Sequence, residues 1–174
     1  MYHGLAHRHL KPSDFLMPPL LNGGRLAGQE ATMPFDVDDA AIRRAEARLG
    51  TRLPPEYTAE LRFSNGGELE LLDEIWFLHP VFDDRDERRL KRTCCDVVHE
   101  TNEARSWNLF PSEGVSIADN GAGDHLLFLP KAGDPSQLSS SVYCWRHDTG
   151  QVEPAIDIFP ARGRPSRGST NRRA

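Results

Sequence analysis

Two acidic side chains, two glycines and an asparagine fall within the six residues Asp119–Asp124, Asp-Asn-Gly-Ala-Gly-Asp, between two apolar runs. Carboxylate and amide oxygens at such short spacing could hold a metal ion. Glycine-rich backbone could instead cradle a phosphate group. A pair of carboxylates could also serve as the acid and base of a hydrolytic enzyme. The remaining interpretation is a tight turn between two strands, so this segment decides between an enzyme and a binding module.

The sequence around Asp119–Asp124 favours the turn. A helix–loop–helix calcium site needs a glutamate at its twelfth position, and counted from Asp119 that position is Pro130. A phosphate cradle needs a helix after the glycines, whereas Leu126–Leu129 is typical of a second strand. Asn and Gly tolerate positive φ, and Asp side chains can accept hydrogen bonds from the loop backbone. We therefore predict a hairpin turn that these side chains shape.

A further candidate for chemistry lies at His147 and Asp148, which suggest a base and the acid that orients it. Neighbouring residues of a strand point to opposite faces, so the two are not expected to form a dyad. A hydrolase or metal enzyme built on Asp119, Asp124 and His147 stays as a hypothesis, although no sequence pattern pairs these residues. The motifs of serine hydrolases, zinc proteases and dithiol redox proteins do not occur.

The remaining histidines and cysteines indicate neither a metal site nor a disulfide framework. His3, His7 and His9 lie close together in the sequence, but no acidic or cysteine ligand accompanies them. Cys94 and Cys95 are adjacent, so on a helix we expect one in the core and the other partly exposed. Three cysteines in total fit a reducing compartment. We expect no catalytic residues, no cofactor and no metal.

The apolar spacing predicts helices first and strands later. Residues 36–49 have a helical apolar face with a capping acid at Asp36 or Asp38, and residues 54–65 follow as a second short helix of a helical hairpin. The longest helical pattern is Asp84–Trp107. Six short strand-forming segments with intervening turns predict an antiparallel sheet. These strands are expected to begin at Glu68, Glu74, Gly114, His125, Ser141 and Gln151, with turns or loops at 120–124, 131–140 and 148–150.

The charge of the chain is divided unevenly. The 174 residues carry a net charge of −5. Residues 162–174 contain five arginines and no acid, so residues 1–161 carry −10. An acidic body repels nucleic acid phosphates and favours a basic partner. No apolar run is long enough to span a membrane and no signal peptide is recognisable, so we expect a cytoplasmic protein.

Composition divides the chain into three parts. Proline and glycine interrupt residues 1–35, which we interpret as an irregular N-terminal extension. Residues 36–161 carry the periodic apolar patterns of one folded domain. Residues 162–174 are rich in Arg, Ser and Gly, and we predict a basic disordered tail.

Three blocks of sequence occur in an order shared with a known family. In the first, AEARLGTRLPPEYTAELRFSNGG, a helix ends in Leu-Gly and is followed by Leu-Pro-x-x-Tyr and Ser-Asn-Gly-Gly. The second, VSIADNGAGDHLLFLP, is a strand–loop–strand with an Asp-Asn-Gly-x-Gly-Asp loop. The third, VYCWRHDTGQV, is a hairpin. Together the blocks resemble the SMI1/KNR4 (SUKH) superfamily over Ile42 to Val152, roughly two-thirds of the chain.

This resemblance implies an α+β fold with an antiparallel-dominated, mixed sheet packed against several helices. It also implies a function without catalysis. Bacterial members resemble immunity proteins, which bind and neutralise a cognate toxin that is often a nuclease, and fungal members are regulatory proteins.

We therefore expect a protein partner, foremost a basic toxin domain of the nuclease type, and neither direct nucleic acid binding nor a membrane. The alternative is a regulatory or scaffold module of the SMI1/KNR4 type without a toxin. For each tryptophan, a position in the core is the competing interpretation. The candidate contact residues are Trp76, Trp107, Trp145, Asp119, Asn120 and Asp124.

Overall fold

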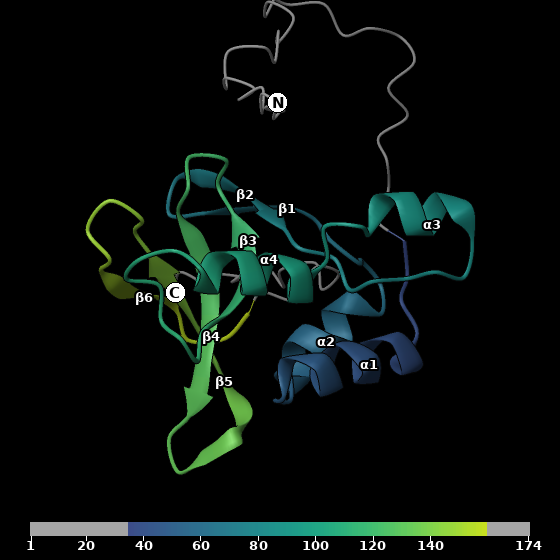
Figure 1. Ribbon diagram of the computed structural model, residues 1–174, viewed down its shortest axis with the longest axis horizontal. Coiled ribbons are helices and arrows are strands. Elements are labelled where there is room, and N and C mark those ends of the chain that lie inside the picture. Colours follow the sequence, from purple (N-terminus) through teal and green to yellow (C-terminus); the bar gives the residue numbers. More distant parts are fainter. Residues whose placement is uncertain (1–34, 160–174) are drawn as a thin grey trace, which may run out of the picture. The chain divides into compact units, whose positions relative to one another are not determined.

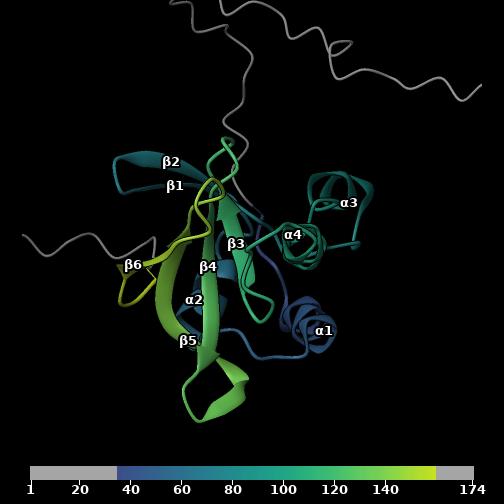
Figure 2. The ribbon, with the colours of Figure 1, turned by 60° about the vertical axis from the view of Figure 1, so that its left-hand side comes forward.

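The computed structural model describes residues 35–159, which form one six-stranded antiparallel sheet with four helices (Figures 1 and 2). The strands lie in the sheet in chain order, β1 to β6. The elements are α1 (Asp39–Leu49), α2 (Pro55–Leu61), β1 (Gly67–Leu71), β2 (Glu74–Leu78), α3 (Glu87–Arg92), α4 (Val97–Arg105), β3 (Val115–Asp119), β4 (His125–Lys131), β5 (Asp134–Trp145) and β6 (Val152–Ile156).

The predicted α+β class is confirmed, and every neighbouring pair of named strands is antiparallel rather than mixed. None of these four helices is long and apolar enough to cross a membrane. The predictions for the N-terminal extension before Phe35 and for the basic tail fall outside the described residues.

The helical hairpin forms as the sequence predicts. The Asp38 carboxylate accepts a hydrogen bond of 2.7 Å from the Ala41 amide, and Gly50 ends α1 with a left-handed φ of 73°. Pro55 begins α2, where a missing amide proton costs nothing. The α2 residue Tyr57 is buried edge-on against Phe128, with ring centroids 5.3 Å apart. The hairpin therefore packs its apolar face directly onto the sheet.

Strand β4 is buried on both faces, which makes it the centre of the fold. Leu126 and Phe128 face a large cluster that includes residues of α1 and α2. Leu127, between them, faces a smaller cluster that contains Ala104, Phe110 and Trp145. Because side chains alternate along a strand, a continuous apolar run is what a doubly covered strand requires.

The predicted helix Asp84–Trp107 is wrong, because the chain forms two helices there. The Asp96 carboxylate accepts hydrogen bonds from the amides of Val98 and His99 at 2.8 and 3.2 Å, so it caps a new helix, α4. Thr93 follows the last residue of α3, where its hydroxyl accepts from the Asp83 amide and lies within hydrogen-bond distance of the Arg89 carbonyl, each at 3.0 Å. Side chains that bond the backbone locally thus interrupt an otherwise helical pattern.

The two cysteines lie where the predicted helix is interrupted, so they do not occupy helical positions. Cys94 and Cys95 lie between α3 and α4, and both are exposed. The expectation that one of them packs in the core is therefore wrong. Leu90 of α3 is also 42% exposed.

The long loop predicted at 131–140 is also wrong. Lys131 of β4 pairs with Asp134 of β5, so the turn consists of Ala132 and Gly133 alone. Gly133, the second of the two turn residues, has a φ of 82°, which glycine adopts without strain. Pro135 and the following serines gave this stretch the composition of a loop, although it forms the first part of β5.

Asn65 ties the segment after α2 to the segment after β2. Its side-chain amide donates to the Val81 carbonyl at 2.8 Å, and its side-chain oxygen accepts from the Val81 amide at 2.7 Å. Both bonds are buried. The Asn65 amide donates in turn to the Phe35 carbonyl at 2.7 Å. The Asn65 side chain therefore satisfies both backbone groups of Val81, as a neighbouring strand would.

We expect Asn65→Ala to lower the free energy of unfolding by about 2 to 3 kcal/mol, because it leaves two buried backbone groups without partners. Asn102→Ala, at an exposed position of α4, is the matched control and should change stability by less than about 0.5 kcal/mol. Urea unfolding at neutral pH measures both values. Equal destabilisation in the two variants would show that the Asn65 bonds do not anchor the fold.

Candidate protein-binding site

The segment Asp119–Asp124 is a hairpin turn between β3 and β4, as predicted. The Asp119 carboxylate accepts from the Gly121 amide at 2.8 Å, and the Asn120 side-chain oxygen accepts from the Ala122 and Asp124 amides at 2.9 and 3.2 Å. One Asp119 oxygen and the Asn120 side-chain oxygen therefore shape the backbone of the turn. The positive φ values belong to the glycines, not to Asn120.

Gly123 is required here for two reasons. Its φ is 105°, which side-chain-bearing residues rarely adopt. A Cβ at this position would also lie 3.1 Å from the His147 ring. The turn therefore closes onto the β5–β6 connection with little room for a side chain at this position.

Asp124, at the end of the turn, links three hairpins. One carboxylate oxygen accepts from the His147 amide at 3.0 Å and lies 2.9 Å from Nδ1 of the same ring. The other accepts from Arg146 Nη1 at 2.7 Å. Arg146 also donates to Glu74 of β2 at 3.1 Å, and Asn120 donates to Glu74 at 2.8 Å. We call Glu74, Asn120, Asp124, Arg146 and His147 the Asp124 clamp.

Asp124 and His147 do meet, although the sequence analysis found no pattern that pairs them. Burial by itself would raise the pKa of Asp124, but the hydrogen bonds from His147 and Arg146 outweigh it and hold the pKa at about 2. A carboxylate this acidic is a weak proton acceptor near neutral pH. Among residues 35–159, no three His, Cys, Asp or Glu side chains are placed to hold one metal ion. The contacts of Asp124 are those of a structural ion pair.

We expect Asp124→Asn to lower the free energy of unfolding by about 2 to 3 kcal/mol at pH 7. Because folding lowers the pKa of Asp124, its contribution is complete above pH 4 and is lost as the pH falls toward 2. The difference between the parent chain and the variant should therefore shrink over this window in urea unfolding experiments. Glu153→Gln, on the exposed part of β6, is the control. A difference that does not change with pH would contradict the ion pair.

Behind the turn lies a buried polar chain that the sequence analysis missed. The Ser116 hydroxyl is 3.1 Å from Nε2 of His79 and 2.7 Å from Nδ1 of His125. Burial, followed by repulsion from His125, lowers the pKa of His79 to about 3. Burial also lowers the pKa of His125. Both rings are therefore neutral at pH 7. Only the fold brings these residues together, because they come from three different segments.

We expect the folded protein to lose stability as the pH falls below 6.5. The unfolded chain binds a proton at His79 that the folded protein excludes, which costs about 1.4 kcal/mol per pH unit between pH 6.5 and 3. His79→Gln should reduce this slope in urea unfolding experiments at pH 7, 6 and 5. His99→Gln, at an exposed position of α4, should leave the slope unchanged. Identical slopes in all three proteins would show that His79 is not the group concerned.

Two of the three candidate tryptophans are core residues. Trp76 and Trp145 are 0% and 1% exposed, so neither indole presents surface to a partner. Trp76 donates its indole N–H to the Leu71 carbonyl at 2.9 Å, and Trp145 donates to the Leu109 carbonyl at 3.1 Å. For both residues the interpretation as a core residue is confirmed and the interpretation as a direct contact residue is wrong. The sequence alone does not distinguish a buried indole from a surface one.

Trp107 is the tryptophan at the surface, 44% exposed, and it borders a pocket of about 390 Å³ beside the turn. Helix α4 supplies one wall, and the β3–β4 hairpin supplies the other. The floor includes His125, whose ring centroid lies 5.2 Å from that of Trp107. The lining residues are Glu100, Glu103, Ala104, Trp107, Asp119, Gly121, Gly123 and His125.

The pocket continues onto an exposed face of the β1–β2 ribbon. Phe77 pairs with Asp119 across the β2–β3 junction, and directly opposite residues share a face of the sheet. Phe77 and Ile75 are each 47% exposed, and their partners across β1 are the acids Glu68 and Glu70. We call this surface the acidic–aromatic face. Its residues are Glu68, Glu70, Ile75, Phe77, Glu100, Glu103, Trp107 and Asp119.

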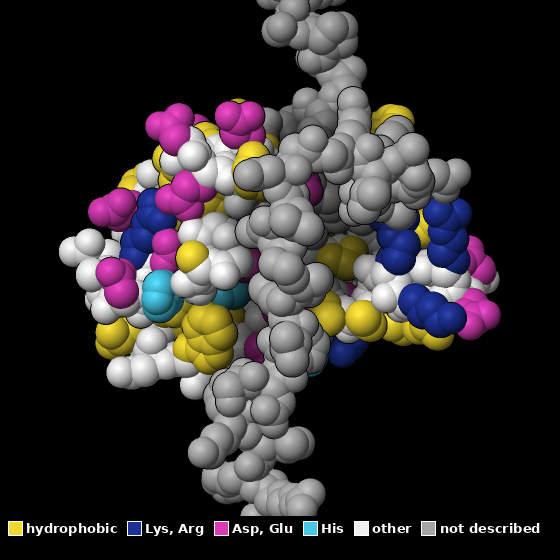
Figure 3. Space-filling view, turned by 90° about the horizontal axis from the view of Figure 1, so that it is seen from above, with side chains coloured by type: hydrophobic (Ala, Val, Ile, Leu, Met, Phe, Trp, Pro, Cys, Tyr) yellow, Lys and Arg dark blue, Asp and Glu magenta, His cyan; other side chains and the backbone are white. Residues whose placement is uncertain are grey.

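Charge is segregated over the molecule. Residues 35–159 contain 24 acidic and 13 basic residues, and ten of the basic ones fall within residues 43–92, on α1, α2, α3 and their connections. Figure 3 shows acidic side chains gathered over the end of the sheet formed by the β1–β2 and β3–β4 hairpins, and Lys and Arg gathered over α3. The acidic–aromatic face therefore lies on the acid-rich side.

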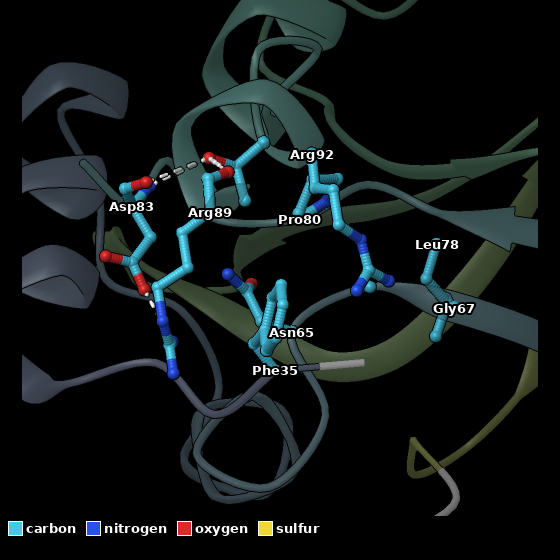
Figure 4. Close-up of a pocket in the computed structure, with 10 residues that line it drawn as sticks. Phe35, Asn65, Gly67, Leu78, Pro80, Asp83, Arg89 and Arg92 are labelled. Carbon is cyan, nitrogen blue, oxygen red and sulfur yellow. Dashed lines mark hydrogen bonds and ion pairs between the residues drawn. The ribbon is translucent and has the colours of Figure 1, made fainter. Parts of the chain in front are cut away.

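A second cavity, of about 120 Å³, lies near α3 and has a structural explanation (Figure 4). Arg89 and Arg92 flank the Phe35 ring, with their guanidinium carbons 4.7 and 4.5 Å from its centroid. Arg89 also donates to the buried Asp83 carboxylate at 3.0 Å, and Arg85 donates to it at 2.7 Å. These bonds, led by those from Arg85, hold the pKa of Asp83 at about 2. The basic side chains of this region are engaged with the protein itself.

A comparison with protein families identifies the family of the chain. The model of the SMI1 / KNR4 family (SUKH-1) matches residues 36–160. The chain belongs to this family. No curated protein sequence matches it. SMI1/KNR4-type domains are generally non-catalytic and are commonly immunity proteins.

The motifs that carried the resemblance to the SMI1/KNR4 family have structural roles here. Asn65 of the Ser-Asn-Gly-Gly block bonds the backbone of Val81. The Asp-Asn-Gly-x-Gly-Asp block forms the β3–β4 turn, and the Trp-x-His block supplies Trp145 and His147 to the core and the clamp. The surface residues of the acidic–aromatic face, in contrast, fall mostly between these blocks. No signal in the sequence marked Glu100, Glu103 or Phe77 as a site, because exposure is decided by the fold.

Proposed function

We propose that this protein is a non-catalytic binding domain of the immunity type, which neutralises a cognate toxin by covering a basic surface of it with the acidic–aromatic face. The observation that carries the proposal is the exposure of Phe77, Ile75 and Trp107 within a border of carboxylates. Exposed aromatic side chains within a charged border are typical of protein interfaces.

The chemistry of this face suits a toxin that grips nucleic acid. Such a surface is basic where it meets phosphate, and an acidic partner is drawn to it rapidly. Carboxylates at the border would accelerate association and set orientation, while the apolar side chains would hold the complex once formed. Neutralisation would follow from covering the basic surface, without any chemical step.

We expect co-expression of the chain to rescue cells from a toxin domain encoded beside its gene. Phe77→Ser should weaken binding to that domain by at least about 30-fold, the effect of a central contact residue. Phe63→Ser is the matched control, because Phe63 is 79% exposed beyond the end of α2 and outside this face. Calorimetry at two salt concentrations provides the measurement, with weaker binding expected at the higher salt.

Failure of the chain to bind or neutralise any toxin domain from neighbouring genes would overturn the immunity function. Equal loss of binding in the Phe63 and Phe77 variants would leave neutralisation standing but would move the contact surface elsewhere. A partner that is not a toxin would instead support the regulatory or scaffold role.

A further inference from the structure

We propose that the pocket bordered by Trp107 receives an arginine side chain of the partner protein. The walls bring three carboxylates, from Glu100, Glu103 and Asp119, to the border of one aromatic ring. An arginine of a partner presupposes the protein-binding function proposed above. Three kinds of group in the pocket favour arginine: the carboxylates, the His125 ring nitrogen and the Trp107 ring.

The α4 carboxylates of the pocket have no cation of their own. Neither Glu100 nor Glu103 makes an ion pair or a side-chain hydrogen bond with any group in residues 35–159. Burial raises the pKa of Glu100, and the nearby charges of Asp119 and Glu103 raise it further against an opposing effect of His99. Like charges that repel one another at the border of a pocket would be stabilised by an incoming cation.

The floor of the pocket supplies a second, independent observation. His125 is only 4% exposed, and the Ser116 hydroxyl occupies its Nδ1 at 2.7 Å. Its other ring nitrogen, Nε2, has no hydrogen-bond partner within residues 35–159. A polar atom without a partner, on a side chain that is otherwise nearly buried and lines a pocket, indicates a group that arrives from outside.

The buried polar chain favours an acceptor at that nitrogen. The Asp119 carboxylate lies 3.9 Å from Nδ1 of His79, which favours a proton there and leaves Nε2 of His79 to accept from Ser116. The Ser116 oxygen then accepts from Nδ1 of His125. Nε2 of His125 is left with a lone pair, so the pocket offers acceptors and invites a donor.

The ring of Trp107 completes the site. It is held edge-to-face against His125 and lies 6.1 Å from the ring centroid of Trp145, which fixes one side of the indole while leaving 44% of the residue exposed. A guanidinium group stacks on indole more readily than on any other side chain.

Arginine fits these groups better than the other cations do. The acids are not placed to converge on one metal ion, as no such cluster exists among residues 35–159. Lysine offers a compact point charge, whereas the guanidinium group presents five donors in a plane and can reach separated acceptors while stacking on a ring. Because the acceptors of the pocket are separated from one another and lie beside the Trp107 indole, they favour the guanidinium group of arginine.

The first test uses N-acetyl-arginine amide as the probe and the neutral isostere N-acetyl-citrulline amide as its matched control. In ¹H–¹⁵N NMR of the ¹⁵N-labelled 174-residue chain, millimolar arginine amide should shift the Trp107 indole signal and the Gly121 and Gly123 amides. Citrulline amide should shift none of them. Equal shifts with both probes, no shift with either, or arginine shifts confined to other acidic positions would overturn the inference.

Two substitutions locate the effect. Glu103→Gln and Trp107→Leu should each raise the apparent Kd for arginine amide roughly two- to five-fold, as expected for an exposed ion pair and an exposed cation–π contact. Glu87→Gln on α3 removes another exposed acid, outside the pocket, and should have no effect. An effect of Glu87→Gln as large as that of Glu103→Gln would show general charge attraction instead of a site.

Deletion of residues 162–174 tests the other source of arginine, because this segment contains five. Arginine amide should bind the parent and shortened chains alike. Binding by the shortened chain alone would mean that the chain's own arginines fill the pocket, which would overturn the assignment to a partner.

A captured toxin domain separates this inference from the proposed function. Neutralisation that survives Glu103→Gln and Trp107→Leu undiminished would leave the immunity function intact and overturn the arginine pocket. Binding of arginine amide by a chain that neutralises no toxin would leave the arginine pocket standing and overturn the immunity function.

Discussion

Three β-hairpins meet at the carboxylate of Asp124. Its two oxygens accept from Arg146 and His147 of the β5–β6 connection, and Arg146 extends the contact to Glu74 at the β1–β2 turn. Burying a carboxylate is unfavourable unless donors surround it, so the pairing is strong only when all three hairpins are docked. The turn that ends at Asp124 also forms one wall of the neighbouring pocket. The candidate site therefore depends on an ion pair that is not itself part of the binding surface.

The charged side chains of the described residues fall into two groups, those paired within the protein and those without an ion-pair partner. Near α3, the buried Asp83 is saturated by Arg85 and Arg89, and those arginines have little left to offer a partner. On the acidic–aromatic face, Glu100 and Glu103 have no cation within the described residues. Paired charges stabilise a particular geometry, whereas unpaired ones at a surface act at a distance on whatever approaches. The separation explains how one small domain can be both internally cross-linked and electrostatically attractive to a basic protein.

The sequence predicts what is local and misses what depends on register. The caps at Asp38 and Gly50 and the Asp119–Asp124 turn follow from short-range chemistry, and the structure has them where the sequence places them. The single helix over 84–107 was wrong because apolar spacing does not reveal that Asp96 begins a new helix. The predicted loop over 131–140 was wrong because the proline and serines there are typical of loops, whereas the segment pairs with β4 as the first part of β5.

The candidate site was less accessible to sequence analysis than the fold. Asp124 and His147 lie 23 residues apart and meet only through the register of β4 and β5. Periodicity also does not distinguish an indole in the core from one on the surface, so the sequence leaves both interpretations open for Trp76 and Trp145. Asp119 and Asn120 form the turn that the sequence predicts, and one oxygen of each side chain accepts from backbone amides of that turn. What the sequence identified was the support of the site, and the exposed groups followed from the fold.

The buried Trp145 shows how that support reaches the surface. Its indole N–H holds the Leu109 carbonyl at 3.1 Å, and Leu109 has a φ of 70°, an unfavourable value for a side-chain-bearing residue. Gly150 approaches the same residue so closely that a Cβ there would lie 2.6 Å from Leu109. The segment that carries Trp107 is thus held by contacts of Leu109 with Trp145 and Gly150 in the free protein. Since ordering side chains is a large part of the cost of association, an indole already held in place gives more of its contact energy to binding.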